Sequence, residues 1–272
     1  MVTVDGKVLD KNQVPTPTTA DSDTLLSAVL TVAREVAGDR SDVTVCGVGC
    51  GGPMTRKGGR VSPLNIPAWR EFPLRKRLSD SLGLHVAVDN DAKALALGEA
   101  WFGAGRKYSN FLAMVVSTGI GGGLFVDGDL LDGLAGNAGH IGHVVVEPEG
   151  AMCACGSRGC LEAEASGPSI GRRIGAHPST AGVEEKRRAG TLVGRAVASV
   201  VNLLDLEHVL VGGSVALAFG DEFFTAANTE LSERCRLDFS RGVQISRVGL
   251  GAEAPLVGAA AIGFRSRGID AR

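Results

Sequence analysis

The sequence predicts an α/β protein made of two related units. Apolar segments of strand length alternate with segments whose apolar residues recur every three or four positions, a pattern typical of parallel strands joined by helices. In each half, one strand-like segment runs directly into glycines: residues 43–48 precede GCGGP, and HVLV precedes GGS. No low-complexity linker interrupts the alternation. The two halves therefore look like related α/β units.

Turn and capping signals set the element boundaries in the first half. Asp5-Gly6 between two short apolar segments predicts a hairpin near the start. Ser22 and Asp23 are suitable caps for a helix over residues 24–37, whose apolar residues share one face. The segments that follow predict a strand over 43–48, a helix over 74–82, a strand over 85–88 and a helix from residue 91.

The second half begins near Arg106 and repeats the alternation. Residues 111–117 predict a strand, STGIGGG a turn and LFVDGDLLDG a hairpin. A cysteine-rich segment and a stretch of charged and small residues, 171–190, come next. The remaining segments predict a helix over 191–204, a strand over 208–214, a helix from about 221, a strand over 243–248 and an Ala-rich helix over 255–264.

Composition excludes several classes of function. The 272 residues carry a net charge of −2 with scattered basic residues, which gives no electrostatic footprint for nucleic acid. No apolar run approaches the roughly 20 residues of a membrane-spanning helix, and the N-terminus lacks the apolar segment of a signal peptide. Six cysteines without an export signal predict reduced thiols. We expect a cytoplasmic protein that binds neither nucleic acid nor membranes.

The segment GHVVVEPEGAMCACGSRGC, residues 142–160, gathers one histidine and three cysteines. Cys153 and Cys155 are separated by one residue and cannot easily form a disulfide with each other. Together with His143 and Cys160 they offer three thiolates and one imidazole, the tetrahedral donor set of a structural zinc ion. The alternative, a set of small buried residues, is what we expect of the other cysteines, Cys46, Cys50 and Cys235.

Two other chemistries for this cluster are disfavoured. A thioredoxin-like redox motif needs Cys-x-x-Cys, which the chain lacks. A metal-dependent hydrolase needs an open coordination position, and three cysteines with one histidine leave none. The cluster therefore predicts structural zinc.

The segment GHVVVEPEGAMCACGSRGCLE resembles the consensus of the ROK family of sugar kinases and repressors, in which Gly-His is followed by Cys-x-Cys-Gly-x-x-Gly-Cys-x-Glu. The likeness covers essentially the whole chain. It implies an α/β, two-domain actin-like fold of the hexokinase and Hsp70-like ATPase kind, with a zinc loop over residues 140–162. It also implies domains over residues 1–105 and 106–254, and a C-terminal helix within 255–272 that returns to the first domain.

The resemblance assigns the sugar site. VDNDAKALALGEA resembles the family segment that carries the catalytic aspartate, which makes Asp91 the base for the sugar hydroxyl. Its alternative role is helix capping, for which Asn and Asp are both favoured. His143 receives two roles, zinc ligand and sugar contact. The residues implied to hold the sugar are Gly51, Gly52, Asn65, Asn90, His140, His143 and Glu162.

The resemblance also assigns the nucleotide site. STGIGGG matches the second phosphate-binding loop of the family, and LVGGS resembles its segment near the adenosine. Glycines let backbone N–H groups face phosphates, although a hairpin turn or a strand-to-helix turn would look the same. Mg²⁺ would bridge the phosphates of ATP. The residues implied are Thr118, Gly119, Gly121, Gly122, Gly123, Gly212 and Gly213.

The chain departs from the family pattern at three places. Family members open with a strand and a phosphate loop of the type Asp-x-Gly-Gly-Thr, which this sequence lacks, so we expect an incomplete version of a working kinase with weak or no activity. Lys93 stands where the family usually has Asn, and Ser214 stands where it usually has a third Gly; we expect a solvated helix residue at Lys93 and a helix cap at Ser214. His140 stands where most members have Glu; bacterial N-acylmannosamine kinases of the family look similar here.

The expected function is an ATP-dependent hexose kinase that acts on the 6-hydroxyl of glucose or an N-acylated hexosamine. Of these substrates, N-acylmannosamine is slightly favoured. The alternative is a non-catalytic sugar-binding protein. Repressors of the family add an N-terminal helix-turn-helix, for which there is no room before the first hairpin. The sequence does not distinguish between ATP and polyphosphate as the phosphate donor. The expected partners are the sugar, the phosphate donor and a second copy of the chain in a homodimer.

Overall fold

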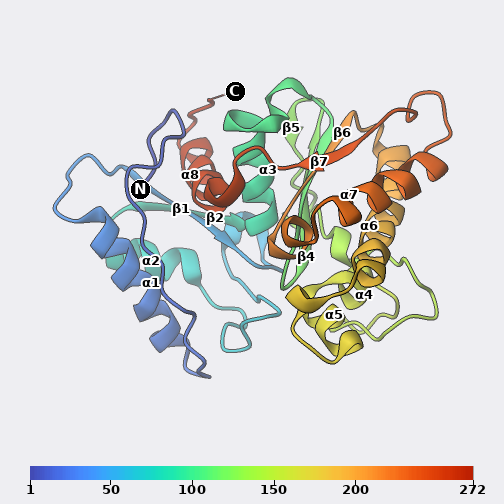
Figure 1. The fold of residues 1–272 in the computed structure, drawn as a ribbon. Helices are drawn as coiled ribbons and strands as arrows, with labels where there is room; N and C mark the ends of the chain where they lie inside the picture. Colours follow the sequence, from blue (N-terminus) through green and yellow to red (C-terminus); the bar gives the residue numbers. More distant parts are fainter. Residues whose placement is uncertain (272) are drawn as a thin grey trace.

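Two sheets organise the chain in the computed structural model, which describes residues 1–271 (Figure 1). The first sheet is a parallel pair, β1 (Val45–Cys50) and β2 (His85–Asn90). The second has five strands in the order β5-β4-β3-β6-β7, with β3 parallel to β6 and antiparallel to β4. Its strands are β3 (Phe111–Val116), β4 (Ile120–Val126), β5 (Asp129–Leu130), β6 (His208–Gly212) and β7 (Ile245–Arg247).

Helices separate and cover the sheets in three layers. In Figure 1, α1 (Ser22–Ala37) and α2 (Leu74–Leu82) lie on the outer side of β1 and β2. Helices α3 (Asp91–Phe102) and α8 (Ala254–Ser266) lie between the two sheets, and α3 contacts strands of both. The far side of the second sheet carries α4 (Leu161–Ala165), α5 (Gly167–Ile174), α6 (Val183–Leu204) and α7 (Ser214–Arg234).

An apolar core lies at each of three contacts between a helix layer and a sheet. Leu25, Leu78 and Val88 belong to the core between α1, α2 and the first sheet. A central core joins α3 and α8 to β3 through residues such as Leu97 and Ala113. The largest core packs α6 and α7 against the second sheet. Burial of apolar surface in these three places is what holds the sheets in their relative positions.

Several predicted boundaries are confirmed and others are wrong. The helix over 74–82 and the helix starting at Asp91 occur as predicted. The first helix begins at Ser22. Its cap is Asp21, whose carboxylate accepts hydrogen bonds from the backbone N–H groups of Asp23 and Thr24. Helix α6 begins at Val183 rather than at 191. The predicted turn over 117–123 is a turn only to residue 119, because β4 starts at Ile120.

The C-terminal helix α8 packs backbone to backbone against the first half of the chain. A Cβ atom on Gly258 would collide with the carbonyl oxygen of Ala94 in α3, and one on Gly47 of β1 would collide with that of Ala259. Glycine at these positions therefore allows the helices and strand to approach closely. The domain boundaries at 105/106 and 254/255 stay a prediction.

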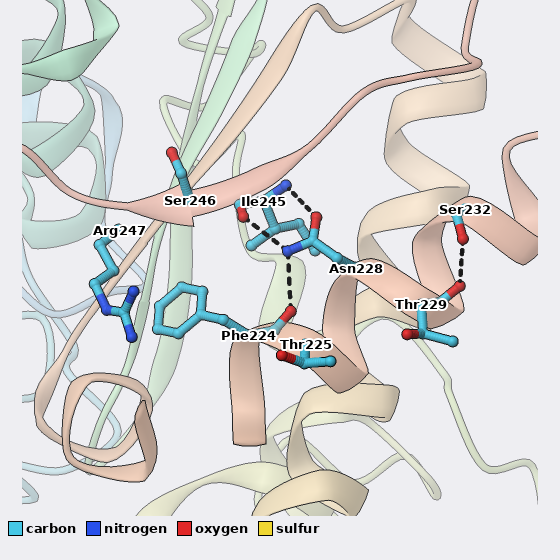
Figure 2. A pocket seen from close by; sticks show the side chains of 8 residues that line it. All are labelled: Phe224, Thr225, Asn228, Thr229, Ser232, Ile245, Ser246 and Arg247. Carbon is cyan, nitrogen blue, oxygen red and sulfur yellow. Dashed lines mark hydrogen bonds between the residues drawn. The ribbon is translucent and has the colours of Figure 1, made fainter. Parts of the chain in front are cut away.

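A hollow of about 600 Å³ lies along β7 (Figure 2). In it, the side-chain amide of Asn228 accepts a hydrogen bond from the N–H of Ile245 (2.8 Å) and donates one to its carbonyl oxygen (2.9 Å). Because β7 is the last strand of the sheet, Asn228 occupies both groups of Ile245 at an open edge. The hollow is lined by Phe224, Thr225, Asn228, Thr229, Ser232, Ile245, Ser246 and Arg247, none of which is a predicted site residue.

Gly258→Ala tests the close packing of α8 on α3. Alanine is favoured over glycine inside an isolated helix by about 1 kcal/mol, yet we expect this variant to lose about 1–3 kcal/mol of unfolding free energy, since its methyl group has no room. Urea unfolding measures the change. The control is Gly182→Ser, at an open helix N-cap with an ordinary backbone conformation, where serine is tolerated. Unchanged stability of Gly258→Ala would contradict the packing argument.

Candidate functional site

The N-terminus of α3 presents Asn90 and Asp91 in different roles. The side-chain oxygen of Asn90 accepts hydrogen bonds from the backbone N–H groups of Ala92 (2.9 Å) and Lys93 (3.3 Å) and so caps the helix. Asp91 begins the helix and accepts a hydrogen bond from Ala92 N–H at 2.9 Å. Since Asn90 meets the capping requirement, capping does not explain why Asp91 is an aspartate.

The Asp91 carboxyl group remains open to solvent while protein surrounds it on most sides. The resulting loss of hydration raises the pKa of this carboxyl group above its ordinary value, against the opposing effect of the Ala92 N–H. Burial, with a smaller contribution from the Asp91 charge, also raises the pKa of the neighbouring Cys50 thiol to about 12. Cys50 therefore stays a neutral thiol, and of these two groups Asp91 is the one that is able to accept a proton near neutral pH.

Gly52, Asn90 and His140 converge beside Asp91. A Cβ atom on Gly52 would lie 3.2 Å from His140 Nε2 and 3.3 Å from Asn90 Nδ2. Burial and the nearby His143 lower the pKa of His140, while Asp91 and Glu162 oppose this shift. His140 is therefore a neutral imidazole near pH 7, able to donate one hydrogen bond and accept another. Gly51 adjoins this group and faces Pro63.

Asn65 and Glu162 converge at Gly119. A Cβ atom on Gly119 would lie 3.0 Å from Glu162 Oε2 and 3.6 Å from Asn65 Nδ2. Glu162 Oε2 also accepts a hydrogen bond of 2.8 Å from Ile120 N–H, which fixes the carboxylate at the start of β4. Three segments distant in sequence thus place amide and carboxylate groups together, the groups that bind sugar hydroxyls through hydrogen bonds.

The glycines of STGIGGG fall into two groups. Thr118 and Gly119 form the turn after β3, and Thr118 is exposed. Gly121, Gly122 and Gly123 lie inside β4, where Cβ atoms on the first and third would lie 3.1 Å from Ala92 Cβ and 2.6 Å from Ala96 Cβ of α3. A Cβ atom on Gly122 would lie 2.8 Å from Leu112 Cδ1, and the Gly122 N–H donates a hydrogen bond of 2.8 Å to the Gly139 carbonyl oxygen. Packing thus accounts for these three glycines, and their role in nucleotide binding stays a prediction.

The carboxyl ends of β3 and β6 meet at one edge of the second sheet. Gly213 has a φ of 96°, which favours glycine, and a Cβ atom there would collide with the Val116 carbonyl oxygen. Beyond it, the Ser117 and Ser214 hydroxyls are 2.8 Å apart. Ligands commonly bind where parallel strands end. Ser117 was not among the predicted site residues, although its place at the end of a predicted strand and the start of the STGIGGG segment was a usable signal.

Lys93 contradicts the expectation of a solvated helix residue. Its side chain is 1% exposed, and its Nζ lies 2.9 Å from Asp89 Oδ1 and 2.7 Å from Asp132 Oδ1. The expectation was wrong because both acidic partners lie outside the helix that the sequence pattern describes. A buried ammonium group is retained in a fold when it is paired in this way.

His143, Cys153, Cys155 and Cys160 form a compact donor cluster. Their ligand atoms all lie within 4.8 Å of one another, with Cys153 Sγ 3.6 Å from His143 Nδ1 and Cys155 Sγ 3.8 Å from Cys160 Sγ. A tetrahedral zinc ion with Zn–S near 2.3 Å and Zn–N near 2.0–2.1 Å places its ligands about 3.6–3.8 Å apart. The separations are too long for a disulfide, about 2.05 Å, and all six cysteines are free thiols. The donor set therefore fits zinc.

The cluster also connects two parts of the candidate sugar site. Cys160 is fully buried directly before α4, two positions before Glu162, and Val145 forms a β-bridge with it. Burial and the neighbouring sulfurs raise the pKa of Cys160 to about 12, so that a bound cation is needed to keep this thiol deprotonated. Fastening Cys160 to His143 fixes the distance between Glu162 and the His140 segment.

Comparison with known proteins gives the family. A sequence profile of the ROK family matches residues 1–265. The chain belongs to the ROK family. A glucokinase of Thermotoga maritima is 34% identical to it over 96% of this chain and 92% of that protein. An N-acetylmannosamine kinase of Citrobacter koseri is 33% identical over 79% of each. The predicted resemblance is therefore confirmed.

A solved ROK structure has the same fold. The crystal structure of a ROK family glucokinase from Streptomyces griseus, in complex with glucose and AMPPNP, aligns with a TM-score of 0.86 and 28% identity over 97% of this chain and 94% of that one. The α/β architecture of the ROK sugar kinases is thus the architecture of this chain. Among residues 1–271, no helix combines the length and hydrophobicity that a membrane crossing requires.

Zinc content tests the donor cluster. We expect purified protein to hold about one zinc ion per chain, and Cys155→Ser to lose most of it, because three donors bind zinc less tightly than four. Removal of zinc by a chelator should lower the Tm. Elemental analysis and thermal unfolding measure both effects. Cys46→Ser, on β1, is the control and should keep its zinc. Metal-free protein after purification in zinc-containing buffer would contradict the assignment.

Proposed function

We propose that this ROK protein is an ATP-dependent kinase that transfers a phosphoryl group to the 6-hydroxyl of a hexose. The observation that carries the proposal is Asp91: a solvent-accessible carboxyl group with a raised pKa that the helix does not use as its cap. Asn90, His140 and Gly52 lie beside it. The relatives include a glucokinase that matches 96% of this chain and an N-acetylmannosamine kinase that matches 79% of it, which supports the same class of reaction here.

In the proposed reaction, Asp91 accepts the proton of the sugar 6-hydroxyl as that oxygen attacks the γ-phosphorus of ATP. The bond between the γ-phosphorus and the β–γ bridging oxygen breaks, and ADP leaves with its electron pair. The raised pKa of Asp91 suits a general base because the carboxylate binds the proton more readily. The Mg²⁺ that accompanies ATP neutralises charge on the phosphates.

The remaining sugar hydroxyls are proposed to bind Asn65, Asn90, His140 and Glu162. Amide and imidazole groups both donate and accept, whereas the Glu162 carboxylate only accepts. His143 would hold zinc through Nδ1, the atom that faces Cys153, and the sugar through the rest of its ring. Zinc, when bound, keeps the loop 140–162 in one conformation and takes no part in bond making.

The nucleotide is proposed to bind where β3 and β6 end. Ser117, Thr118 and Gly119 follow β3, and Gly213 follows Gly212 at the end of β6, so that both turns lie at the same edge. We further propose that residues 1–105, with α8, and residues 106–254 act as two domains that share the substrates, and that the protein forms a homodimer. Gly121, Gly122 and Gly123 support the turn from within β4.

The sugar itself is proposed to be an N-acylated hexosamine in preference to glucose. Where most ROK kinases have Glu, His140 provides a neutral imidazole with a lowered pKa. An imidazole N–H can donate to an acyl carbonyl, which a carboxylate cannot do. Glucose stays an accepted alternative, because its hydroxyls can donate to the other imidazole nitrogen.

Sugar binding without phosphoryl transfer is the second candidate function. A coupled assay of ADP release, together with calorimetric sugar binding, separates the two candidates. Sugar binding by the 272-residue protein without ADP release would favour the second candidate.

Asp91→Asn tests the base. We expect sugar affinity to change by less than about threefold and kcat to fall by about 10²–10⁴-fold, the usual contribution of a general base. Turnover of the wild type should also fall as the pH drops through the raised pKa of Asp91, because the protonated carboxyl group cannot accept the proton. This acid limb should lie above the ordinary carboxyl value of 3.8.

The control for this test is Asp129→Asn, which removes an exposed carboxylate on β5 and should leave kcat unchanged. Survival of turnover in Asp91→Asn, with the control also active, would show that another group takes the proton.

His140→Glu tests the sugar preference. We expect the ratio of kcat/KM for N-acetylmannosamine to that for glucose to fall about tenfold, the worth of one hydrogen bond of about 1.4 kcal/mol. If the chain binds sugar without turnover, the ratio of the two Kd values by calorimetry reports the same effect. His85→Gln, at the opposite end of β2, is the control. An unchanged ratio in His140→Glu would remove His140 as the determinant.

A further inference from the structure

We propose that Lys93 and Asn137 are positioning residues that hold the loop of residues 131–140 so that His140 faces the sugar. The inference rests on the proposed function and deepens it.

The first tether is the buried ion pair of Lys93. From its place on α3, two residues after Asp91, Lys93 reaches Asp132 at 2.7 Å and the carbonyl oxygen of Gly136 at 3.4 Å. Asp89, at the end of β2, holds the same ammonium group at 2.9 Å. The helix that carries the base is thereby joined to the loop that follows β5.

The second tether is the side-chain amide of Asn137. Its Oδ1 accepts a hydrogen bond from the N–H of Met54 (3.1 Å), and its Nδ2 donates one to the Met54 carbonyl oxygen (2.8 Å). Met54 is buried and lies two residues after Gly52. The loop is therefore held from two directions, by α3 at Asp132 and by the segment after β1 at Asn137.

Between the two tethers, residues 133–135 at the tip of the loop are exposed, whereas Gly136 is buried and accepts the hydrogen bond from Lys93. Leu134 is 96% exposed, although a leucine gains from burial. Two backbone hydrogen bonds inside the loop, from Gly136 N–H to the Gly133 carbonyl oxygen (3.4 Å) and from Ala138 N–H to the Asp132 carbonyl oxygen (3.1 Å), set the conformation of the tip together with the tethers. Beyond Asn137, the carbonyl oxygen of Gly139 accepts the hydrogen bond from Gly122 N–H at 2.8 Å.

These restraints end immediately before His140. The imidazole packs beside Gly52 and Asn90, both of which belong to the segments that the tethers hold. A shift of the loop by about 1 Å is enough to cost up to about 100-fold in a positioned interaction. Lys93 and Asn137 thus act on the sugar through His140, and we do not assign either of them a contact with the sugar.

Asp132→Asn is the variant that tests the proposal. It weakens the tether while Lys93 keeps Asp89, and Asp132 is half exposed, so that the fold is retained. We expect sugar Kd to rise about tenfold, and to rise less than about twofold when the same change is made in a His140→Ala background. Asp132→Glu, which keeps the charge, should restore most of the affinity.

Arg265→Gln is the matched control. Arg265 of α8 pairs with the same Asp132 carboxylate at 3.8 Å, on the solvent side, and its removal should leave sugar Kd unchanged. Equal effects of Asp132→Asn with and without His140 would overturn the proposal, because the tether would then not act through the imidazole. An unchanged Kd in Asp132→Asn would overturn it as well.

Amide hydrogen exchange decides the proposal even if no sugar binds. Asp132→Asn should raise the exchange rate over residues 133–140, and Arg265→Gln should not. Unchanged exchange in Asp132→Asn would overturn the positioning role. Failure of the wild type to bind glucose, mannose, N-acetylglucosamine or N-acetylmannosamine would instead overturn the proposed function and leave the exchange result to judge the tether.

Discussion

Helix α3 must pack against both sheets at once, and the rest of the structure depends on this constraint. On one side it meets the glycines of β4, and on the other it meets α8, whose Gly258 faces the Ala94 carbonyl. Any bulkier residue at these contacts would push the layers apart, since protein interiors are close-packed. The position of Asp91 is therefore decided by the packing of a whole helix and not by the local loop.

Buried charges fix this helix at both ends. Near the N-terminus, Lys93 lies between two carboxylates. Near the C-terminus, the fully buried Glu99 accepts hydrogen bonds from the N–H groups of Ala104 (2.8 Å), Gly249 (2.9 Å) and Leu250 (2.9 Å). Each charge would be costly to bury without these partners. These contacts at both ends fix the rotation of α3 about its axis and its position along that axis. A catalytic base on this helix needs both to be fixed if it is to lie within hydrogen-bond distance of a substrate hydroxyl group.

Local signals in the sequence were enough for some of this arrangement and insufficient for the rest. Apolar spacing located α2 and α3, and ligand spacing located the Cys and His cluster, because those patterns act within a few residues. The ion pair of Lys93 with Asp132 joins residues 39 positions apart, so no local sequence pattern predicts it. The glycines at 121–123 have no side chains whose alternation could predict a strand. Their place in β4 is explained by the close packing of this strand against α3. The first residues of α6 are mostly charged, so they show no apolar spacing from which the start of the helix could be predicted.

The amide of Asn228 has a consequence for how copies of the protein can meet. An outermost strand presents free N–H and C=O groups on which another chain can add a strand. At Ile245 both groups already have a partner in the side chain of Asn228. The sheet is thereby kept finite at β7, and self-association by continuing it from one molecule into the next would first have to displace this amide.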